Sequence, residues 1–128
     1  MASLLAKKTA IITGGITGIG RAIALEYLKQ GANVAVNYFP DEKSSWQYQT
    51  LIDEAGSAYY SKLIAVPGDV SKPETGTSIV QTTVSRFGRL DIFVNNAGVC
   101  QFHDFLTYVS VFPYHLCTAT FLAHLSAL

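Results

Sequence analysis

The stretch T-G-G-I-T-G-I-G at residues 13–20 constrains the fold of this chain most strongly, because four of its eight residues are glycine. The apolar run A-I-I at residues 10–12 precedes it, and apolar residues at helical spacing follow it up to Gly31. A short apolar run closed by glycines is typical of a strand buried on both faces of a parallel sheet. The order strand, glycine turn, helix therefore predicts the first half of a βαβ unit.

The rest of the chain alternates between strand-like and helix-like segments. We expect strands where short apolar runs end at Gly, Pro or Asn, at residues 7–13, 32–38, 62–67 and 90–94. We expect helices at residues 19–31 and 41–56, and a third from the turn at residues 69–74 to Phe87. Ser71 would be the N-cap of this third helix, with Pro73 inside its first turn and Glu74 at capping-box spacing. This alternation predicts an α/β fold: a doubly wound, Rossmann-like parallel sheet, incomplete, with about four strands and flanking helices.

Composition narrows the range of partners. The chain has 128 residues, enough for one domain, and nine basic residues balance nine acidic ones. It therefore has no basic field that would hold nucleic acid or an anionic membrane. Cys100 and Cys117 lack C-x-x-C spacing, and the first residues do not resemble a signal peptide, so we expect a cytoplasmic protein.

The glycine turn is suited to a phosphate group. Gly14 permits a tight turn with positive φ, the next glycine lets a phosphate approach the backbone, and Gly20 lets the helix pack closely. Backbone N–H groups at the helix start then face the anion, with the positive end of the helix dipole behind them. One glycine would suit any strand-to-helix turn, but several glycines within a βαβ unit favour binding of a dinucleotide's pyrophosphate.

Two further motifs follow the later expected strands. G-D-V at residues 68–70 comes after the third strand, and N-N-A-G at residues 95–98 comes after the fourth. With the glycine turn, in this order and on these elements, they resemble the short-chain dehydrogenase/reductase superfamily over about residues 5–105. The resemblance implies an oxidoreductase that uses NAD or NADP to transfer hydride between a carbonyl and an alcohol.

The resemblance also implies where a cofactor would bind. In the family the glycine turn holds the pyrophosphate, the D-V pair flanks the adenine, and N-N-A-G lies beneath the ribose next to the nicotinamide. With the end of the second strand, the implicated residues are Thr13, Gly14, Ile16, Thr17, Gly18, Ile19, Gly20, Asn37, Tyr38, Asp69, Val70, Asn95, Asn96, Ala97 and Gly98.

The end of the second strand discriminates between the two dinucleotides. An acid there would bind both ribose hydroxyls and repel a 2′-phosphate, but the matching residue is Tyr38. The ending Asn37-Tyr38 resembles that of NADP-preferring or dual-specificity members, although Thr17 replaces the usual basic residue of the glycine turn. Arg21 either packs on the surface or contacts a phosphate, and Asp41 acts as the acid if its loop folds back. We expect NADP to be preferred over NAD.

The family's catalytic residues are not found in this sequence. Its members use a tyrosine as general acid/base, with a pKa lowered by a lysine four residues later, and a serine that holds the substrate oxygen. None of the seven tyrosines here has lysine at that spacing. We therefore assign no catalytic residue and expect a truncated cofactor-binding fragment without catalysis. The alternative is a non-enzymatic protein that binds a dinucleotide or pairs with other subunits.

The sequence divides at residue 105. Residues 1–105 are expected to form the cofactor-binding half-domain, whereas residues 106–128 contain no Asp, Glu, Lys or Arg. Three interpretations of this tail are open: a membrane segment, a partner-binding element, or a segment translated out of register with the ancestral reading frame. We favour the third. A membrane span needs about 20 mostly apolar residues, and a proline and two histidines weaken that alternative.

The last expected strand lacks an obvious neighbour in the sequence. Nothing after Gly98 resembles the fifth strand that covers this position in the family. An apolar strand edge invites pairing with another chain, so we expect self-association or subunit pairing there. The cysteines and histidines beyond Gly98 match no recurrent ligand spacing, so no metal site is expected.

Overall fold

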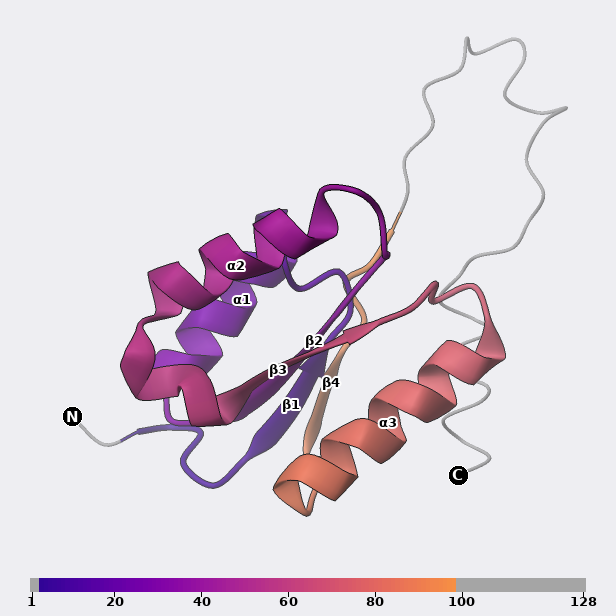
Figure 1. Ribbon diagram of the computed structural model, residues 1–128. Coiled ribbons are helices and arrows are strands. Elements are labelled where there is room, and N and C mark those ends of the chain that lie inside the picture. The colour runs from indigo at the N-terminus through magenta and orange to yellow at the C-terminus, as the bar shows by residue number, and fades with distance from the viewer. Residues whose placement is uncertain (1–2, 99–128) are drawn as a thin grey trace, which may run out of the picture.

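The computed structural model describes residues 3–98 of the chain (Figure 1). The predictions for the tail, the two cysteines and the three histidines lie outside these residues. Within residues 3–98, no helix has the length and apolar character needed to cross a membrane. The elements are β1 (Thr9–Ile12), α1 (Gly18–Lys29), β2 (Asn33–Tyr38), α2 (Ser44–Ala55), the 3₁₀ helix η1 (Ser57–Lys62), β3 (Leu63–Pro67), α3 (Pro73–Phe87) and β4 (Ile92–Val94).

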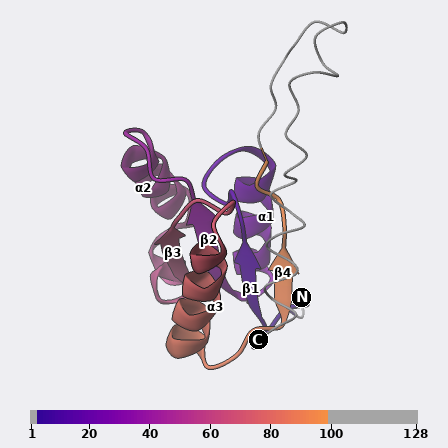
Figure 2. The same ribbon diagram turned by 90° about the vertical axis from the view of Figure 1, so that its right-hand side faces the viewer.

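The four strands form one parallel sheet in the order β3-β2-β1-β4. In β1, Ala10 pairs with Val34 of β2 on one side and with Ile92 of β4 on the other. Helices α1 and α2 cover one face of the sheet, and α3 covers the opposite face (Figures 1 and 2). The prediction of a doubly wound, Rossmann-like sheet of four strands is confirmed.

Side chains of β1 alternate between two hydrophobic clusters. Ile12 and Leu28 belong to the cluster beneath α1 and α2. Ile11 and Ile79 belong to the cluster beneath α3. Successive residues of a strand point to opposite faces, so a strand covered on both faces is apolar throughout rather than at every second residue. This explains why the continuous run at residues 10–12 is a reliable signal of β1.

Two local predictions differ from the structure. Ser71 is not the N-cap of α3: Lys72 takes that position, and Pro73 is the first residue of the helix. The Ser71 hydroxyl instead donates a hydrogen bond to Oδ1 of Asp69 at 2.7 Å, so it is not available to cap the helix. The helix η1 was not predicted, since so short a 3₁₀ segment carries no apolar periodicity.

Candidate functional site

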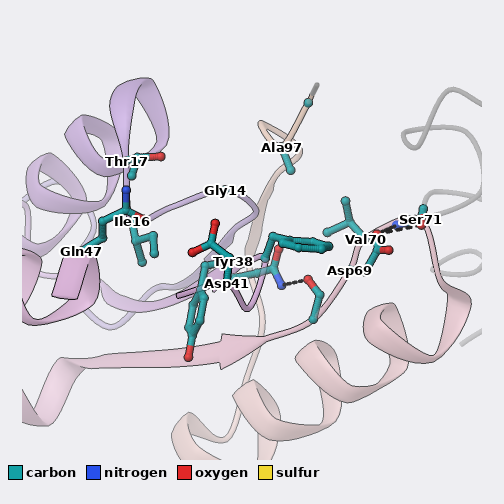
Figure 3. Close-up of a pocket in the computed structure, with 14 residues that line it drawn as sticks. Gly14, Ile16, Thr17, Tyr38, Asp41, Gln47, Asp69, Val70, Ser71 and Ala97 are labelled. Atoms are coloured by element: carbon teal, nitrogen blue, oxygen red, sulfur yellow. Dashed lines mark hydrogen bonds between the residues drawn. The ribbon is translucent and has the colours of Figure 1, made fainter. Parts of the chain in front are cut away.

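A cavity of about 580 Å³ lies at the carboxyl ends of the strands (Figure 3). Its wall comes from the glycine turn after β1, the end of β2 with the loop that follows, the first turn of α2, and the loops after β3 and β4. Doubly wound folds bind their ligands at this edge of the sheet. The lining residues are Gly14, Ile16, Thr17, Asn37, Tyr38, Phe39, Asp41, Gln47, Gly68, Asp69, Val70, Ser71, Ala97 and Gly98.

The three sequence motifs, far apart in the chain, meet around this cavity. The predicted site residues that line it are Gly14, Ile16, Thr17, Asn37, Tyr38, Asp69, Val70, Ala97 and Gly98. The remaining predicted residues lie on the same turns or in the first turn of α1 without lining the cavity, and they are Thr13, Gly18, Ile19, Gly20, Asn95 and Asn96. That all of them serve a cofactor stays a prediction.

Two glycines of the turn serve different purposes. Gly18 has φ of +56°, and a Cβ built there would meet nothing within 4 Å. A Cβ on Gly20 would overlap the carbonyl oxygen of Gly14 and lie 2.6 Å from Nδ2 of Asn96. Gly20 therefore allows α1 to start directly against the turns after β1 and β4. Gly18 keeps the approach to the amino end of α1 open.

The amino end of α1 offers hydrogen-bond donors. Thr17 is its N-cap, but the hydroxyl makes no capping hydrogen bond, and no acidic residue lies in the first turn. The first N–H groups of a helix lack partners within the helix, and the positive end of the helix dipole attracts an anion. Because Gly14, Ile16 and Thr17 line the adjacent cavity, this turn fits a pyrophosphate group.

Hydrogen bonds connect the glycine turn to the N-N-A-G turn. The buried Thr13 hydroxyl accepts the backbone N–H groups of Asn96 at 3.0 Å and Ala97 at 2.9 Å. The Asn96 side chain donates to the carbonyl oxygens of Thr13 at 3.1 Å and Gly14 at 3.3 Å. Thr13 and Asn96 thus hold the two turns together. The neighbouring Asn95 has a buried Nδ2 that makes no hydrogen bond to the described residues.

The end of β2 combines a buried amide with aromatic rings. Asn37 is buried, and its Nδ2 donates to the carbonyl oxygens of Val66 and Gly68, each at 3.1 Å. The Tyr38 ring stacks on that of Tyr48 in α2, with centroids 6.4 Å apart. Burial, with a smaller contribution from Tyr38, raises the pKa of Tyr48. Asn37 therefore shapes the cavity by holding the backbone that leads into the G-D-V motif.

Among residues 3–98, the charged side chains that line the cavity are Asp41 and Asp69, and neither Lys nor Arg lines it. Asp69 accepts hydrogen bonds from the hydroxyl and the backbone N–H of Ser71, and these bonds lower the pKa of Asp69. The carboxylate of Asp41 accepts the backbone N–H of Lys43 at 2.9 Å. Asp41 and Tyr38 both line the cavity (Figure 3), and a role of Asp41 as the ribose-binding acid stays a prediction.

Sequence reasoning missed several residues of the cavity wall. Gly68 and Ser71 flank the D-V pair, so extending that motif by one residue on each side would have found them. Phe39 follows the predicted end of β2 and is 63% exposed. Gln47 had no local signal, because it lies on α2 and only the packing of that helix decides which of its residues reach the cavity.

This chain is similar to known short-chain dehydrogenases. The family model described as short chain dehydrogenase matches residues 8–125, so the match continues past residue 105 into the segment without Asp, Glu, Lys or Arg. The chain is 46% identical over 106 residues to the L-rhamnose-1-dehydrogenase of Scheffersomyces stipitis, covering 83% of this chain and 41% of that protein. It is 42% identical over 103 residues to the L-rhamnose 1-dehydrogenase (NAD(P)(+)) of a Sphingomonas species, with coverages of 80% and 39%.

A solved structure is also similar to this chain. The short-chain dehydrogenase/reductase glucose/ribitol dehydrogenase from Brucella melitensis superposes with a TM-score of 0.67 at 28% identity, covering 79% of this chain and 40% of that one. The chain thus spans about two fifths of the length of these proteins. Its strand order, its glycine turn and these matches together show that the chain belongs to the short-chain dehydrogenase family.

Proposed function

We propose that this chain is the cofactor-binding part of a cytoplasmic, NAD(P)-dependent oxidoreductase that acts on a carbonyl/alcohol pair. One observation carries the proposal: the glycine turn, the G-D-V motif and the N-N-A-G turn meet around one cavity at the carboxyl ends of parallel strands. The names of two relatives, both L-rhamnose 1-dehydrogenases, support a sugar as the substrate class. Fluorescence microscopy of the tagged chain tests its location.

The lining residues suggest how a dinucleotide would lie. The turn through Gly14 and Thr17 would hold the pyrophosphate with backbone N–H groups at the start of α1. Asp69 and Val70 would flank the adenine, and the turn at Ala97 would lie beneath the ribose near the nicotinamide. When bound, the nicotinamide supplies the hydride donor or acceptor.

The proposed preference is for NADP over NAD, with either accepted. The Asn37-Tyr38 ending of β2 supports NADP. The Asp41 carboxylate opposes this preference, because it would repel a 2′-phosphate. Titration with NADPH and NADH should therefore give a modest preference for NADPH that increases in Asp41→Asn. Tighter binding of NADH by the unaltered chain would contradict the preference.

The chain is proposed to bind without catalysing hydride transfer. No tyrosine here has the lysine partner that the family uses to lower a phenol pKa. The 128-residue chain mixed with NADPH and a panel of ketones and sugars should show no turnover. Sustained oxidation of NADPH would show that other residues supply the proton and would refute this part of the proposal.

A charge placed at the glycine turn tests the binding site itself. Gly18→Asp sets a carboxylate where the pyrophosphate would lie, and Asp is among the residues that tolerate positive φ best. Gly88→Asp is the matched control. Gly88 lies at the carboxyl end of α3, has φ of +80°, and a Cβ built there would also meet nothing within 4 Å. Calorimetry should show NADPH binding abolished only in Gly18→Asp, with Gly18→Asn intermediate. Equal affinities in all variants would refute the site.

A second proposal concerns subunit pairing through β4. Ile92 and Val94 are partly exposed, whereas every residue of the adjacent β1 is buried. Strands of parallel sheets are normally covered on both faces, so the β4 side of the sheet is suited to association with another subunit of the same family. Light scattering at increasing concentration and co-purification with an intact relative test this. A monomer at every concentration that captures no relative would refute it.

A further inference from the structure

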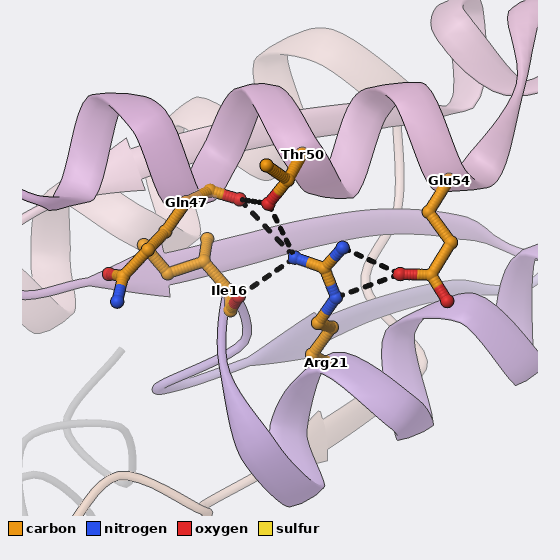
Figure 4. A network of polar contacts seen from close by, with 5 residues as sticks. All are labelled: Ile16, Arg21, Gln47, Thr50 and Glu54. Carbon is orange, nitrogen blue, oxygen red and sulfur yellow. Dashed lines mark hydrogen bonds and ion pairs between the residues drawn. The ribbon is translucent and has the colours of Figure 1, made fainter.

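Arg21, in the first turn of α1, contacts two separate parts of the cavity wall (Figure 4). Its Nη1 donates to the carbonyl oxygen of Ile16 at 3.4 Å and to that of Gln47 at 3.3 Å. Ile16 belongs to the glycine turn and Gln47 to α2, and both residues line the cavity. One guanidinium nitrogen thus bridges the backbone of the turn after β1 and the backbone of a different helix.

Two further residues of α2 hold the guanidinium in place. Oγ1 of Thr50 accepts from Nη1 of Arg21 at 3.1 Å, and the same hydroxyl donates to the carbonyl oxygen of Gln47 at 2.8 Å. Glu54 Oε2 accepts from Nε at 3.0 Å and from Nη2 at 2.6 Å. The Glu54 side chain is 56% exposed, so its Coulomb attraction is weakened by solvent. Its main effect is to orient the guanidinium plane so that Nη1 faces the two carbonyls.

In the described part of the chain, no other side chain duplicates this connection. Gly15 is bonded through its N–H to the carbonyl of Asn37 in β2, and Thr13 is bonded to the turn after β4. These contacts hold the β1 side of the glycine turn. Within residues 3–98, the hydrogen bonds that join the glycine turn to α2 all come from Arg21.

We propose that Arg21 is a positioning residue for the dinucleotide: it keeps the pyrophosphate turn and the start of α2 at a set separation, so that a ligand spanning both meets a preorganised surface. The inference rests on the proposed dinucleotide function. Nε, Nη1 and Nη2 all donate to protein oxygens, which favours packing over phosphate contact, the two roles considered for Arg21. Preorganisation raises affinity because less ordering is required on binding.

Arg21→Lys is the informative variant. Lysine keeps the positive charge, but its ammonium lacks the planar fork that reaches Ile16, Gln47 and Glu54 together. AMP would contact mainly the adenosine end, whereas NADPH spans both regions. In Arg21→Lys the dissociation constant of NADPH should rise more than that of AMP, so the ratio of AMP over NADPH should fall about tenfold. This is the size expected when a charged hydrogen bond within the protein is lost and only binding of the dinucleotide depends on that bond.

Two control variants separate positioning from general stability. Glu54→Gln keeps an acceptor oxygen for Nε and Nη2 but loses the charge, so the ratio should fall less than in Arg21→Lys. Thr50→Val removes one contact to Nη1 but leaves both carbonyl contacts, so a smaller fall is expected. Partial unfolding would raise both dissociation constants by the same factor and leave their ratio unchanged.

The outcomes are distinguishable. If the unaltered chain binds NADPH and Arg21→Lys shows the same ratio, the positioning role is refuted while the proposed function stands. If the unaltered chain binds neither ligand, the proposed function fails, and amide hydrogen exchange then tests Arg21 independently. Arg21→Lys should speed exchange at residues 16–20 and 44–50 together. Faster exchange in only one of these segments would refute the connection between them.

Discussion

The neighbouring strands β1 and β4 are both mainly apolar but are differently buried. β1 pairs with β2 and β4, and all of its residues are buried. β4 has three residues, Ile92-Phe93-Val94, and each is partly exposed. The difference comes from their neighbours, because α1 and α3 pack on opposite faces of β1. Apolar composition therefore predicts that a strand forms, and the elements packed on it decide how far it is buried.

Polar contacts hold both ends of β4. At its amino end the Asp91 carboxylate accepts the backbone N–H of Thr9 at 2.9 Å. At its carboxyl end the Thr13 hydroxyl accepts the N–H groups of Asn96 and Ala97. Both strands share the ladder between them, but β1 is fully buried, whereas β4 is partly exposed and has polar contacts at both ends. Because the carboxyl end borders the cavity, the N-N-A-G turn is well positioned although β4 itself is short.

The largest difference between the strands is expected from removing one apolar side chain in each. Ile11→Ala empties a fully buried position and should lower the free energy of unfolding by about 2–5 kcal/mol. Ile92→Ala removes a partly exposed side chain and should cost about 1 kcal/mol. Urea unfolding of both variants measures the two losses. Equal losses would show that burial in the described residues does not distinguish the strands.

Loss of a hydroxyl tests the polar attachment of β4. Thr13→Val leaves the N–H groups of Asn96 and Ala97 without their acceptor, so it should cost about 1–3 kcal/mol and weaken dinucleotide binding. Thr9→Val is a matched control, since Thr9 is also fully buried but lies at the opposite end of β1. Among the described residues, its hydroxyl accepts a long hydrogen bond, from Asn33 at 3.5 Å. Unfolding and NADPH titration should separate the two variants; similar losses in both would argue against the attachment.

The smallest effect is expected at the other end of β4 and depends on pH. Hydrogen bonds from Arg89 and from the N–H of Thr9, with the charges of Arg89 and Lys8, lower the pKa of Asp91 from 3.8 to about 2. Because the pKa is lower in the fold than in the unfolded chain, ionised Asp91 stabilises the fold above about pH 4, and this is lost as the pH falls through 2.

Asp91→Asn should therefore be less stable than the unaltered chain at neutral pH, and the difference should shrink towards pH 2. Urea midpoints measured at several pH values give this difference. Arg89→Gln, which removes the largest cause of the low pKa, should move the loss of stability to higher pH. A stability difference between Asp91→Asn and the unaltered chain that does not change with pH would contradict the assigned ionisation.

Local signals in the sequence predicted most of the fold. Gly31, with φ of +90°, ends α1 as its position after the apolar period indicated. Pro73 is the first residue of α3, a position where an N–H would have no partner within the helix, so proline loses no hydrogen bond there. Ser71 failed as an N-cap because Asp69, two residues before it, binds the hydroxyl, and two plausible hydrogen-bond partners cannot be ranked from spacing alone.

The family, the succession of strands and helices along the chain, and the position of the glycine turn could all be predicted from local patterns, because they depend on backbone preferences and on motifs a few residues long. The roles of Thr13 and Arg21, in contrast, depend on how distant elements pack. Thr13 finds its partners more than 80 residues away because β1 lies next to β4 in the sheet. Arg21 reaches Gln47 because α1 and α2 pack on the same face, and no local pattern specifies which side chains of two packed helices will meet.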